Sequence, residues 1–437
     1  MKKVNLQVYE KVQAIEHSYQ GLGTVKINNF PVFVENLLPG ETADILVKNV
    51  NSKYADAKVI KLYNKSPIRV DIDNEELMKS GSTALANLKY EDQLAFKGNN
   101  VKYLFNRNIH YSNILPILPS SKIWNYRNKL AVFTELLNNK IELGLYEKKT
   151  HNLIPQKSYD LALNPINDLL IWIQNNINNY PEIIKEGNSF NQILVKCSSL
   201  NDEMLLVFNA QKPFQLPKKF IEDVHNAFPK LLSILIVYKD KIINQYISQN
   251  TCLIDKIGNF TFKVNYNSFF QINPYQSNNL YNLLFDNMKL SKDDIVLDAY
   301  SGIGTISIMI ANRVKWVYGL EIVKEATRDA IENAKLNNVN NVTFYASDVL
   351  KTIDKIDQKL TKIIVDPPRE GLHPNFLKKI VEISPNEVGY ISCNYHTLCR
   401  DCDLLIKEGY ELVYLRPCDM FSQTHHIEVV AILRKKA

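Results

Sequence analysis

A single thiol stands where a strand-like run has just ended. The segment Ile391-Ser392-Cys393-Asn394 lies downstream of a second apolar run, Ile363-Ile364-Val365-Asp366, which Pro367-Pro368-Arg369 follow. A thiolate can attack carbon 6 of a pyrimidine, and the enolate that results can accept a methyl group at carbon 5. Afterwards a base must remove the carbon 5 proton before the thiolate leaves. The sequence should therefore also hold a general base.

The candidate base is Glu428, near the start of an apolar run close to the end of the sequence. An isolated carboxylate at such a position is usually a surface residue on an edge strand, but the presence of Cys393 favours a catalytic role. His425 and His426 precede Glu428 and suggest a metal site. The run is typical of a strand, however, and no further ligand cluster is evident, so we predict no zinc.

The elements that must position these residues begin near residue 265, where strand-like runs alternate with helix-like ones. This pattern predicts a doubly wound parallel sheet. The four runs 295–298, 317–321, 342–348 and 363–366 end in the carboxylates Asp298, Glu321, Asp348 and Asp366. Ligands of such sheets bind beyond the carboxyl ends of the strands, so we expect these side chains to converge on one crevice.

The first of these runs leads into a loop of small residues, Ala299-Tyr300-Ser301-Gly302-Ile303-Gly304. Small residues let the backbone approach a ligand, and Glu321 could accept hydrogen bonds from both ribose hydroxyls of a nucleoside cofactor. The alternative is that Glu321 only caps a helix. A dinucleotide-binding loop would normally carry a third glycine, so the loop suits S-adenosylmethionine better.

The Asp366-Pro367-Pro368-Arg369 segment is similar to loops of methyltransferases that act on nucleic-acid bases. Its two prolines fix the backbone, so the group at its start is pre-oriented. Taken alone, the segment equally allows methylation of an exocyclic amino group, for which the usual fourth residue is aromatic. Here that residue is Arg369.

Composition sets the outer limits. The chain has 437 residues, 46% hydrophobic and 22% charged, which predicts a soluble protein of two or three domains. No apolar run approaches the ~20 residues that cross a bilayer, so we expect a cytoplasmic protein with no membrane partner.

The six cysteines are too irregularly spaced for a disulfide framework. Cys399 and Cys402 could form a redox pair, although packing on a helix is the simpler interpretation. The net charge of +6 has its basic excess upstream of residue 265, where a polyanion could bind.

The N-terminal residues 4–62 alternate apolar and polar positions in short runs, which predicts a small β-barrel. The order of Gly21-Leu22-Gly23-Thr24-Val25, Phe33-Val34, Leu38-Pro39-Gly40-Glu41 and Ala57-Lys58-Val59 resembles a TRAM domain, an OB-like barrel of RNA-modifying enzymes. An unrelated docking barrel is the alternative. The mixed patterns that follow predict an α+β central domain.

Five motifs in order extend the resemblance over nearly the whole chain. They are Phe269-Phe270-Gln271-Ile272-Asn273, the 298–305 loop, Asp366-Pro367-Pro368-Arg369, Ser392-Cys393-Asn394 and His426-Ile427-Glu428. With them the chain resembles the RNA 5-methyluridine (uracil-C5) methyltransferase family, in particular the TRAM-bearing branch that methylates 23S ribosomal RNA.

The resemblance implies a multidomain fold: a TRAM β-barrel at 1–63, a central α+β RNA-binding domain at 64–264 and a Rossmann-like methyltransferase domain at 265–437. It further implies that Cys393 is the nucleophile and Glu428 the proton acceptor. The residues that it implies for S-adenosylmethionine binding are Gln271, Tyr300, Glu321, Asp366 and, less directly matched, Asp348. The expected partner is 23S rRNA and the expected state a monomer. A tRNA uracil-C5 methyltransferase and a catalytically silent rRNA assembly factor stay open.

One departure concerns an iron–sulfur cluster that many relatives bind through cysteines just before a Leu-x-Tyr-x-x-Gln-Leu run. The run is present here as Leu88-Lys89-Tyr90-Glu91-Asp92-Gln93-Leu94. The positions before it are Ser80-Gly81-Ser82-Thr83, however, and Tyr159 stands near the expected later ligand. Iron–sulfur clusters are held by cysteine sulfur, so we predict no cluster.

Overall fold

The computed structural model describes residues 4–148 and 150–436. The chain forms two compact units. Unit 1 holds the residues up to Asn100 together with Phe421–His425, and unit 2 holds Val101–Met420 and the residues from His426 onward. Within the described residues, no helix has the length and apolar character that crossing a bilayer would require.

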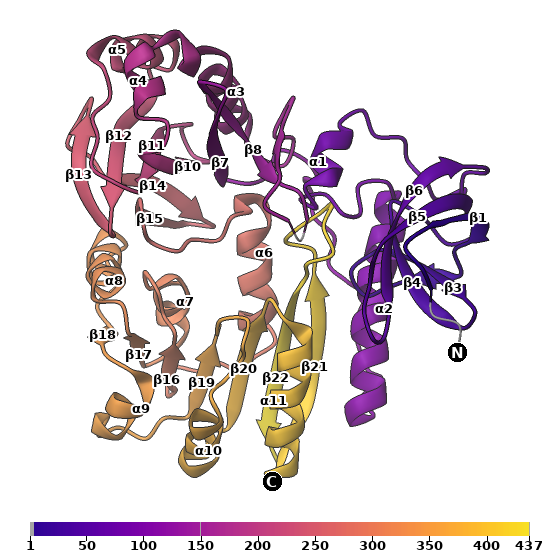
Figure 1. Ribbon diagram of the computed structural model, residues 1–437. Coiled ribbons are helices and arrows are strands. Elements are labelled where there is room, and N and C mark those ends of the chain that lie inside the picture. Colours follow the sequence, from indigo (N-terminus) through magenta and orange to yellow (C-terminus); the bar gives the residue numbers. More distant parts are fainter. Residues whose placement is uncertain (1–3, 149, 437) are drawn as a thin grey trace. The chain divides into compact units, whose positions relative to one another are not determined.

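Unit 1 is built on a six-stranded sheet in the order β1-β5-β6-β4-β3-β2 (Figure 1). The strands are β1 (Val8–Gln13), β2 (Glu16–His17), β3 (Gly23–Ile27), β4 (Phe30–Glu35), β5 (Thr42–Val50) and β6 (Ala55–Leu62). The predicted alternation is visible in β5, where Ala43, Ile45 and Val47 are buried and their neighbours are not. These side chains belong to a core drawn from residues 4–62 alone.

Two helices follow the sheet, α1 (Glu75–Lys79) and α2 (Tyr90–Ile109). Helix α2 begins in unit 1 and ends in unit 2. Its second half contributes Val101 and Phe105 to the main core of unit 2.

Unit 2 contains a first seven-stranded sheet, in the order β13-β12-β11-β10-β7-β8-β9. Its strands are β7 (Lys129–Leu137), β8 (Lys140–Tyr146), β9 (Leu153–Pro155), β10 (Phe190–Cys197), β11 (Met204–Ala210), β12 (Leu231–Tyr238) and β13 (Lys241–Tyr246). The accompanying helices are α3 (Asn164–Asn176), η1 (Ile177–Asn179), α4 (Pro181–Lys185) and α5 (Lys218–Ala227), and a hairpin follows of β14 (Cys252–Ile257) and β15 (Phe260–Asn265). Mixed helices and largely antiparallel strands agree with the predicted α+β character.

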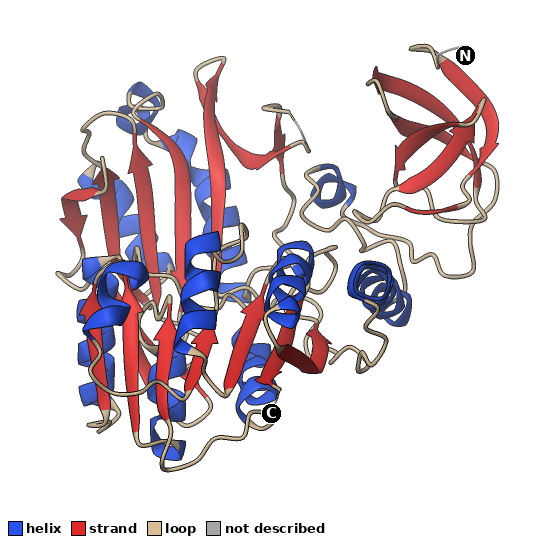
Figure 2. Ribbon diagram, turned by 90° about the horizontal axis from the view of Figure 1, so that it is seen from below, coloured by secondary structure: helices blue, strands red, loops and turns tan. Residues whose placement is uncertain are grey.

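A second seven-stranded sheet, in the order β18-β17-β16-β19-β20-β22-β21, follows α6 (Pro274–Phe285) (Figure 1). Its strands are β16 (Ile295–Ala299), β17 (Trp316–Glu321), β18 (Val342–Ala346), β19 (Lys362–Val365), β20 (Glu387–Ser392), β21 (Tyr410–Cys418) and β22 (Glu428–Lys435). The helices between them are α7 (Thr305–Ile310), η2 (Ala311–Arg313), α8 (Lys324–Leu336), α9 (Val349–Thr352), η3 (Ile353–Lys355), α10 (Pro374–Ile383) and α11 (Tyr395–Lys407). Figure 2 shows helices on both faces of the strands, as in a doubly wound fold.

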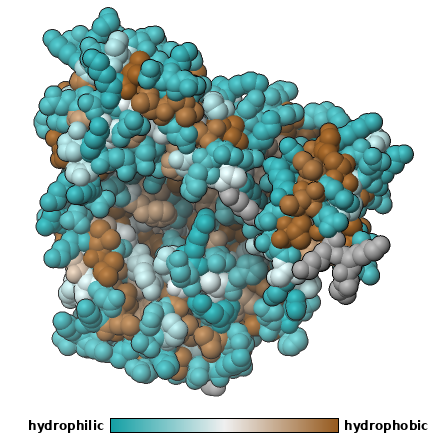
Figure 3. Space-filling view, viewed as in Figure 1, coloured by the Kyte–Doolittle hydropathy of each residue, from teal (hydrophilic) through white to brown (hydrophobic). Residues whose placement is uncertain are grey.

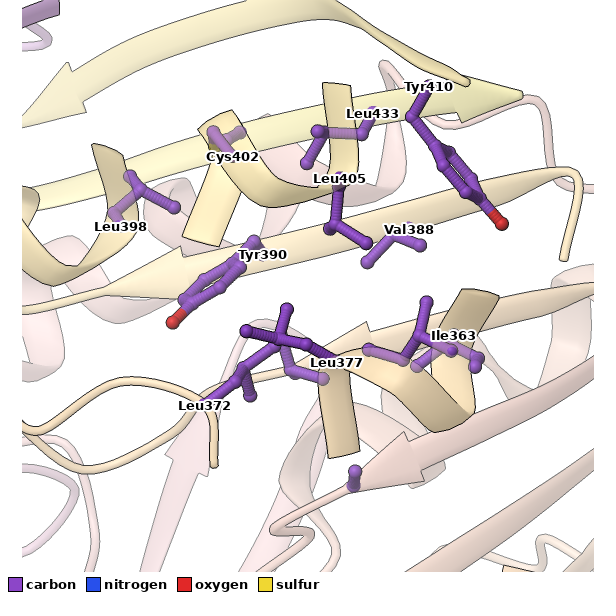
Figure 4. Close-up of a cluster of buried hydrophobic side chains, with 14 of the residues drawn as sticks. Ile363, Leu372, Leu377, Val388, Tyr390, Leu398, Cys402, Leu405, Tyr410 and Leu433 are labelled. Carbon is purple, nitrogen blue, oxygen red and sulfur yellow. The ribbon is translucent and has the colours of Figure 1, made fainter. Parts of the chain in front are cut away.

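Strands β16 to β20 are parallel, whereas β22 runs antiparallel to both of its neighbours, β20 and β21. Apolar side chains from β19, β20, β22, α10 and α11 meet on one face of this sheet (Figure 4). Among them, Tyr390, Leu405 and Leu433 are fully buried. This core holds the strand ends, and hence the side chains that follow them, in fixed register.

Candidate active site

The sequence-predicted residues gather at one edge of the second sheet. The parallel register pairs Ala299 with Leu320 and Val365 with Tyr390, so β16, β17, β19 and β20 end together. Because β22 is antiparallel to β20, its start lies beside the end of β20, with Ser392 opposite Val429. Cys393 follows Ser392 and Glu428 precedes Val429, so the antiparallel pairing brings the thiol and the carboxylate to the same edge.

The loop after β16 has an unusual backbone. Tyr300 has φ +67°, a left-handed conformation that costs a side-chain-bearing residue free energy. The N–H groups of Tyr300 and Ser301 both donate to the carbonyl of Leu320, at 3.0 and 3.1 Å, and hold it there. A Cβ on Gly302 would point into open space, whereas one on Gly304 would lie 2.8 Å from Phe344 Cζ. The loop is therefore packed against the protein at Gly304 and open towards a ligand at Gly302.

Glu321, at the end of β17, is tied to this loop. Its Oε2 accepts from the Gly302 N–H at 3.0 Å and its Oε1 from the Val323 N–H at 2.8 Å. A carboxylate has about four lone-pair directions, so each oxygen can accept one more hydrogen bond. The helix-cap alternative describes part of what Glu321 does, because Val323 immediately precedes α8. The remaining acceptor capacity fits a pair of ribose hydroxyls.

A cavity of about 260 Å³ lies beside Glu321. Tyr300, Glu321 and Asp348 all line it, whereas Asp298 and Asp366, which were expected in the same crevice, do not. Ile322, which is 67% exposed, and Phe376 add apolar surface that sequence reasoning missed. The sequence did contain one signal, because an apolar residue, Ile322, comes directly after the ribose-binding candidate Glu321. Apolar walls, an acidic rim and an open backbone at Gly302 together fit the adenosine part of S-adenosylmethionine.

Asp348 and Asp298 have structural partners of their own. Asp348 caps α9, accepting from the Leu350 N–H at 2.9 Å. Asp298 is fully buried and accepts from the N–H and the hydroxyl of Ser307 at 2.9 and 2.5 Å. Burial, with smaller contributions from the charges of Asp366 and Glu321, raises the pKa of Asp298 to about 7. Asp298 is thus close enough to both carboxylates for their charges to affect its pKa, but it is not among the residues that line the cavity.

Gln271 is buried in the segment that leads into α6. The side chain of Asn128 donates to its backbone carbonyl at 3.1 Å. Its own amide lies within hydrogen-bonding reach of the Tyr281 hydroxyl, which also meets Thr305 at the start of α7. The charge of Asp366 raises the pKa of Tyr281 further above the level that burial sets. Gln271 and Asp366 therefore share a neighbourhood around Tyr281, separate from the residues that line the cavity.

Cys393 is half-buried between the end of β20 and the start of α11. Burial first, and then the charges of Glu428 and Asp366, raise the pKa of its thiol to about 11. The Arg369 guanidinium acts in the opposite direction. In the free protein the thiol is protonated at neutral pH, so its environment must change before it can act as a nucleophile.

Asp366 and Glu428 form a coupled pair of carboxyl groups next to this thiol. Burial raises the pKa of Glu428 well above its usual range, and the neighbouring charge of Asp366 raises it again. Burial likewise raises the pKa of Asp366 to about 7. Two like charges at close range disfavour double ionisation, so near neutral pH the pair retains a proton. A carboxyl group accepts a proton only in its ionised form. A more polar environment, or neutralisation of the partner carboxylate, would favour this form.

Sequence reasoning missed how the Asp366-Pro367-Pro368-Arg369 loop is held. The side chains of Asn394 and Thr397 both donate to the Arg369 carbonyl, at 2.9 and 3.2 Å. Further along α11, Asp401 accepts from the Leu372 N–H at 2.8 Å and from the Tyr390 hydroxyl at 2.8 Å. Helix α11 therefore fixes the loop that carries Arg369. In the sequence, the only indication of this was that Asn394 lies next to Cys393.

The five other cysteines are all buried. Cys399 and Cys402 are buried on α11 within the main core, which confirms the packing interpretation. Burial raises the pKa of Cys399 to about 11 and that of Cys402 well above its usual range. Among residues 4–148 and 150–436, no group of three or more His, Cys, Asp or Glu side chains is placed to hold a metal ion.

A doubly wound sheet whose ligand cavity lies at the ends of β16 and β17 is characteristic of an S-adenosylmethionine-dependent methyltransferase. The chain belongs to the tRNA (uracil-5-)-methyltransferase family, whose model matches residues 89–436, and residues 11–60 match the TRAM domain. The protein is therefore an RNA (uracil-C5)-methyltransferase with S-adenosylmethionine as its methyl donor. The resemblance to the uracil-C5 methyltransferase family with a TRAM domain is confirmed, and so is the predicted fold class.

Similar proteins agree with this assignment. An "uncharacterized RNA methyltransferase" of Enterococcus faecalis is 33% identical over 443 aligned residues, which cover 97% of either chain. One of Lactobacillus johnsonii is 33% identical, with 96% of each chain covered. The crystal structure of Pyrococcus abyssi tRNA (uracil-54, C5)-methyltransferase in complex with S-adenosyl-L-homocysteine superimposes with a TM-score of 0.74 at 24% identity. The match covers 97% of the present chain and 100% of that one.

Proposed function

We propose that this enzyme methylates carbon 5 of a uridine in 23S rRNA through a covalent adduct between Cys393 and carbon 6. The observation that carries the proposal is the antiparallel placement of β22 against β20, because it sets the thiol and Glu428 at one edge beside Asp366. An amino-group methyltransferase would leave both Cys393 and Glu428 without a task. A catalytically silent assembly factor would likewise have no use for the pair.

In the first step the Cys393 sulfur bonds to carbon 6 of a uridine that has left its base stack. Removing a base from a loop costs only a few kcal/mol. The thiol must first lose its proton, and Arg369 is the group nearby whose charge favours the thiolate. When bound, S-adenosylmethionine supplies the electrophilic methyl group, and its proposed contacts are Gln271, Tyr300, Glu321, Asp348 and Asp366.

In the second step the carbon 5 proton is removed. Before this step, carbon 5 carries both the methyl group transferred to it and its original hydrogen. Glu428 takes that proton, the electron pair restores the 5,6 double bond, and the Cys393 sulfur leaves. The raised pKa of Glu428 makes it a stronger base, once it is ionised, than an ordinary carboxylate.

The substrate assignment rests on the TRAM domain, because the sequence resembles the TRAM-bearing branch that acts on 23S rRNA. The second candidate is a tRNA. The family name and the Pyrococcus abyssi structure both favour it, since that enzyme is named for uridine 54 of tRNA. Mapping 5-methyluridine by mass spectrometry in the rRNA and tRNA of cells with and without this gene separates the two. Loss from tRNA alone would overturn the rRNA assignment.

The mechanism is tested with RNA that contains 5-fluorouridine, because fluorine at carbon 5 cannot be removed as a proton. The intact enzyme with S-adenosylmethionine should form a complex with this RNA that survives denaturation. Cys393→Ala should form none and give no product. On ordinary RNA, Glu428→Gln should accumulate the adduct and release methylated RNA about 100-fold more slowly. Equal turnover by Glu428→Gln would remove this carboxylate from the mechanism.

A further inference from the structure

The Leu88–Leu94 run, which the sequence resemblance singled out, has no task in the proposed mechanism. In the structure its Gln93 is 1% exposed and meets Gln423, which is 3% exposed. Gln93 Nε2 donates to Gln423 Oε1 at 2.8 Å, and the Gln423 N–H donates to Gln93 Oε1 at 3.0 Å. Gln93 Nε2 also donates to the Leu88 carbonyl at 3.0 Å. Both functional ends of the Gln93 amide are therefore engaged.

The same short segment is held at two more points. The Leu85 N–H donates to the Gln423 carbonyl at 3.0 Å. One helical turn after Gln93, the buried Lys97 donates through Nζ to the Phe421 carbonyl at 3.0 Å. We call these contacts of Leu85, Gln93 and Lys97 with Phe421–His425 the Gln423 anchor. They explain why this segment belongs to unit 1 although its flanks belong to unit 2.

The contacts of the Gln423 anchor hold Gln423 in an unfavourable backbone conformation. Its φ is +68°, in the left-handed region that is unfavourable for residues other than glycine. A strained residue persists only where its surroundings determine its position. Here the backbone N–H, the backbone carbonyl and the side chain of Gln423 are all bound by residues 85–93.

The anchored segment leads directly to the proposed base. Only His426 and Ile427 separate it from Glu428, and each residue spans at most about 3.5 Å. On its other side, the Asn273 side chain holds the Met420 carbonyl at 3.0 Å. The loop between β21 and β22 is thus hydrogen-bonded at Met420 and at Gln423, and only a short stretch of chain leads from Gln423 to Glu428.

We propose that Gln93 and Gln423 are positioning residues that act on the Glu428 carboxylate through the two-residue link between the anchored segment and Glu428, and so affect the proton-removal step. The proposal rests on the proposed function of Glu428. It predicts that breaking the anchor slows loss of the carbon 5 proton and spares the attack of Cys393. A residue with only a structural role would slow both steps alike.

The test compares Gln93→Ala, Gln423→Gly and the double variant with the intact enzyme. Glycine at 423 tolerates the positive φ, so this variant removes the side chain without adding strain. The matched control is Asn87→Ala, which removes another buried amide of unit 1, one that donates to Asn36 Oδ1 at 2.9 Å. With [5-³H]uridine RNA, the two single variants should release tritium about tenfold more slowly and form the 5-fluorouridine adduct at the normal rate. The double variant should be no slower than the single ones, because they remove one shared contact.

A second readout needs no RNA. Because the Glu428 charge raises the pKa of the Cys393 thiol, a displaced Glu428 should lower it. Alkylation rates against pH should therefore give a lower thiol pKa in Gln93→Ala, in the direction that Glu428→Gln gives, and an unchanged one in Asn87→Ala. Unchanged tritium release and thiol pKa in folded Gln93→Ala, or equal slowing of both chemical steps, would overturn the proposal. Absence of a Cys393-dependent adduct in the intact enzyme would instead overturn the proposed function.

Discussion

The thiol of Cys393 is surrounded by groups that oppose its ionisation. Burial and the two carboxylates Glu428 and Asp366 raise its pKa, and Arg369 alone among its named neighbours lowers it. A reactive cysteine normally lies in an electropositive environment. In this protein the environment of the thiol instead favours the protonated form near neutral pH.

This balance predicts the pH dependence of Cys393 alkylation. Below a pKa of about 11 the thiolate fraction, and with it the rate of reaction with iodoacetamide, should rise about tenfold for each pH unit. Glu428→Gln removes a charge that raises the pKa, so its rate at pH 9 should exceed that of the intact enzyme. Arg369→Met removes the opposing charge, so its rate should be lower. Mass spectrometry of the labelled peptide measures all three, and a rate that is already constant at pH 8 would contradict the prediction.

At the level of elements, the parallel strands were predictable because each is a short apolar run that ends in a carboxylate. Tyr300, Glu321 and Asp348 follow β16, β17 and β18, and the structure brings them to one cavity. Other features depend on contacts distant in sequence. Nothing in the sequence around Glu428 fixes β22 between β20 and β21, and the hold of Asn394 on Arg369 spans two separate strand ends.

The sequence likewise did not show to which unit the segment Phe421–His425 belongs. Only Asp419 and Met420 separate Phe421–His425 from the end of β21, and the sequence of this segment gives no sign that it packs with residues 85–97. Gln93 and Gln423 are far apart in sequence, but both are buried in the fold and hydrogen-bond to each other. Local patterns predict strands and helices, whereas hydrogen bonds between distant segments follow from the complete fold.

The loop after β16 gives a prediction for a single element. Gly304 has φ +83°, and a Cβ there would lie 2.8 Å from Phe344 Cζ and 3.1 Å from Ala330 Cβ. Gly304→Ala should lower the free energy of unfolding by about 2–4 kcal/mol, since left-handed strain and overpacking add. Thermal unfolding measures this. Gly302→Ala has the same positive φ class but meets no neighbour within 4 Å, so it should lose less stability while still weakening S-adenosylmethionine binding. Equal melting temperatures for the two variants would contradict the packing argument.

At the scale of the whole molecule, the N-terminal sheet presents a surface with both apolar and basic residues. Figure 3 shows apolar patches among hydrophilic ones on the N-terminal part. On β6 and just beyond it, Ile60 is 53% and Tyr63 43% exposed, and Lys61 lies 4.9 Å from the centre of the Tyr63 ring. Aromatic and cationic side chains together suit single-stranded RNA, in which bases stack and phosphates attract.

Because this surface is basic, we expect it to contribute to RNA affinity in a way that weakens as the salt concentration rises. Replacing the exposed Lys58 and Lys61 together by alanine should weaken binding to all RNAs alike. It should also reduce the slope of log affinity against log salt by about 1–2. Filter binding at several salt concentrations measures the slope. The control is Lys218→Ala with Lys219→Ala on α5, which removes the same charge from exposed lysines elsewhere. An equal loss of slope in both pairs would show that the effect is only one of net charge.

The position of β22 has a consequence for the order of events during synthesis. A ribosome makes residues 428–435 after every other described strand, and yet this strand fills the place between β20 and β21. While it is unmade, the sheet has an open slot and the proposed proton acceptor does not yet exist. The sheet that carries the proposed site is therefore complete only after this strand, the last of the described strands to be made, has been inserted.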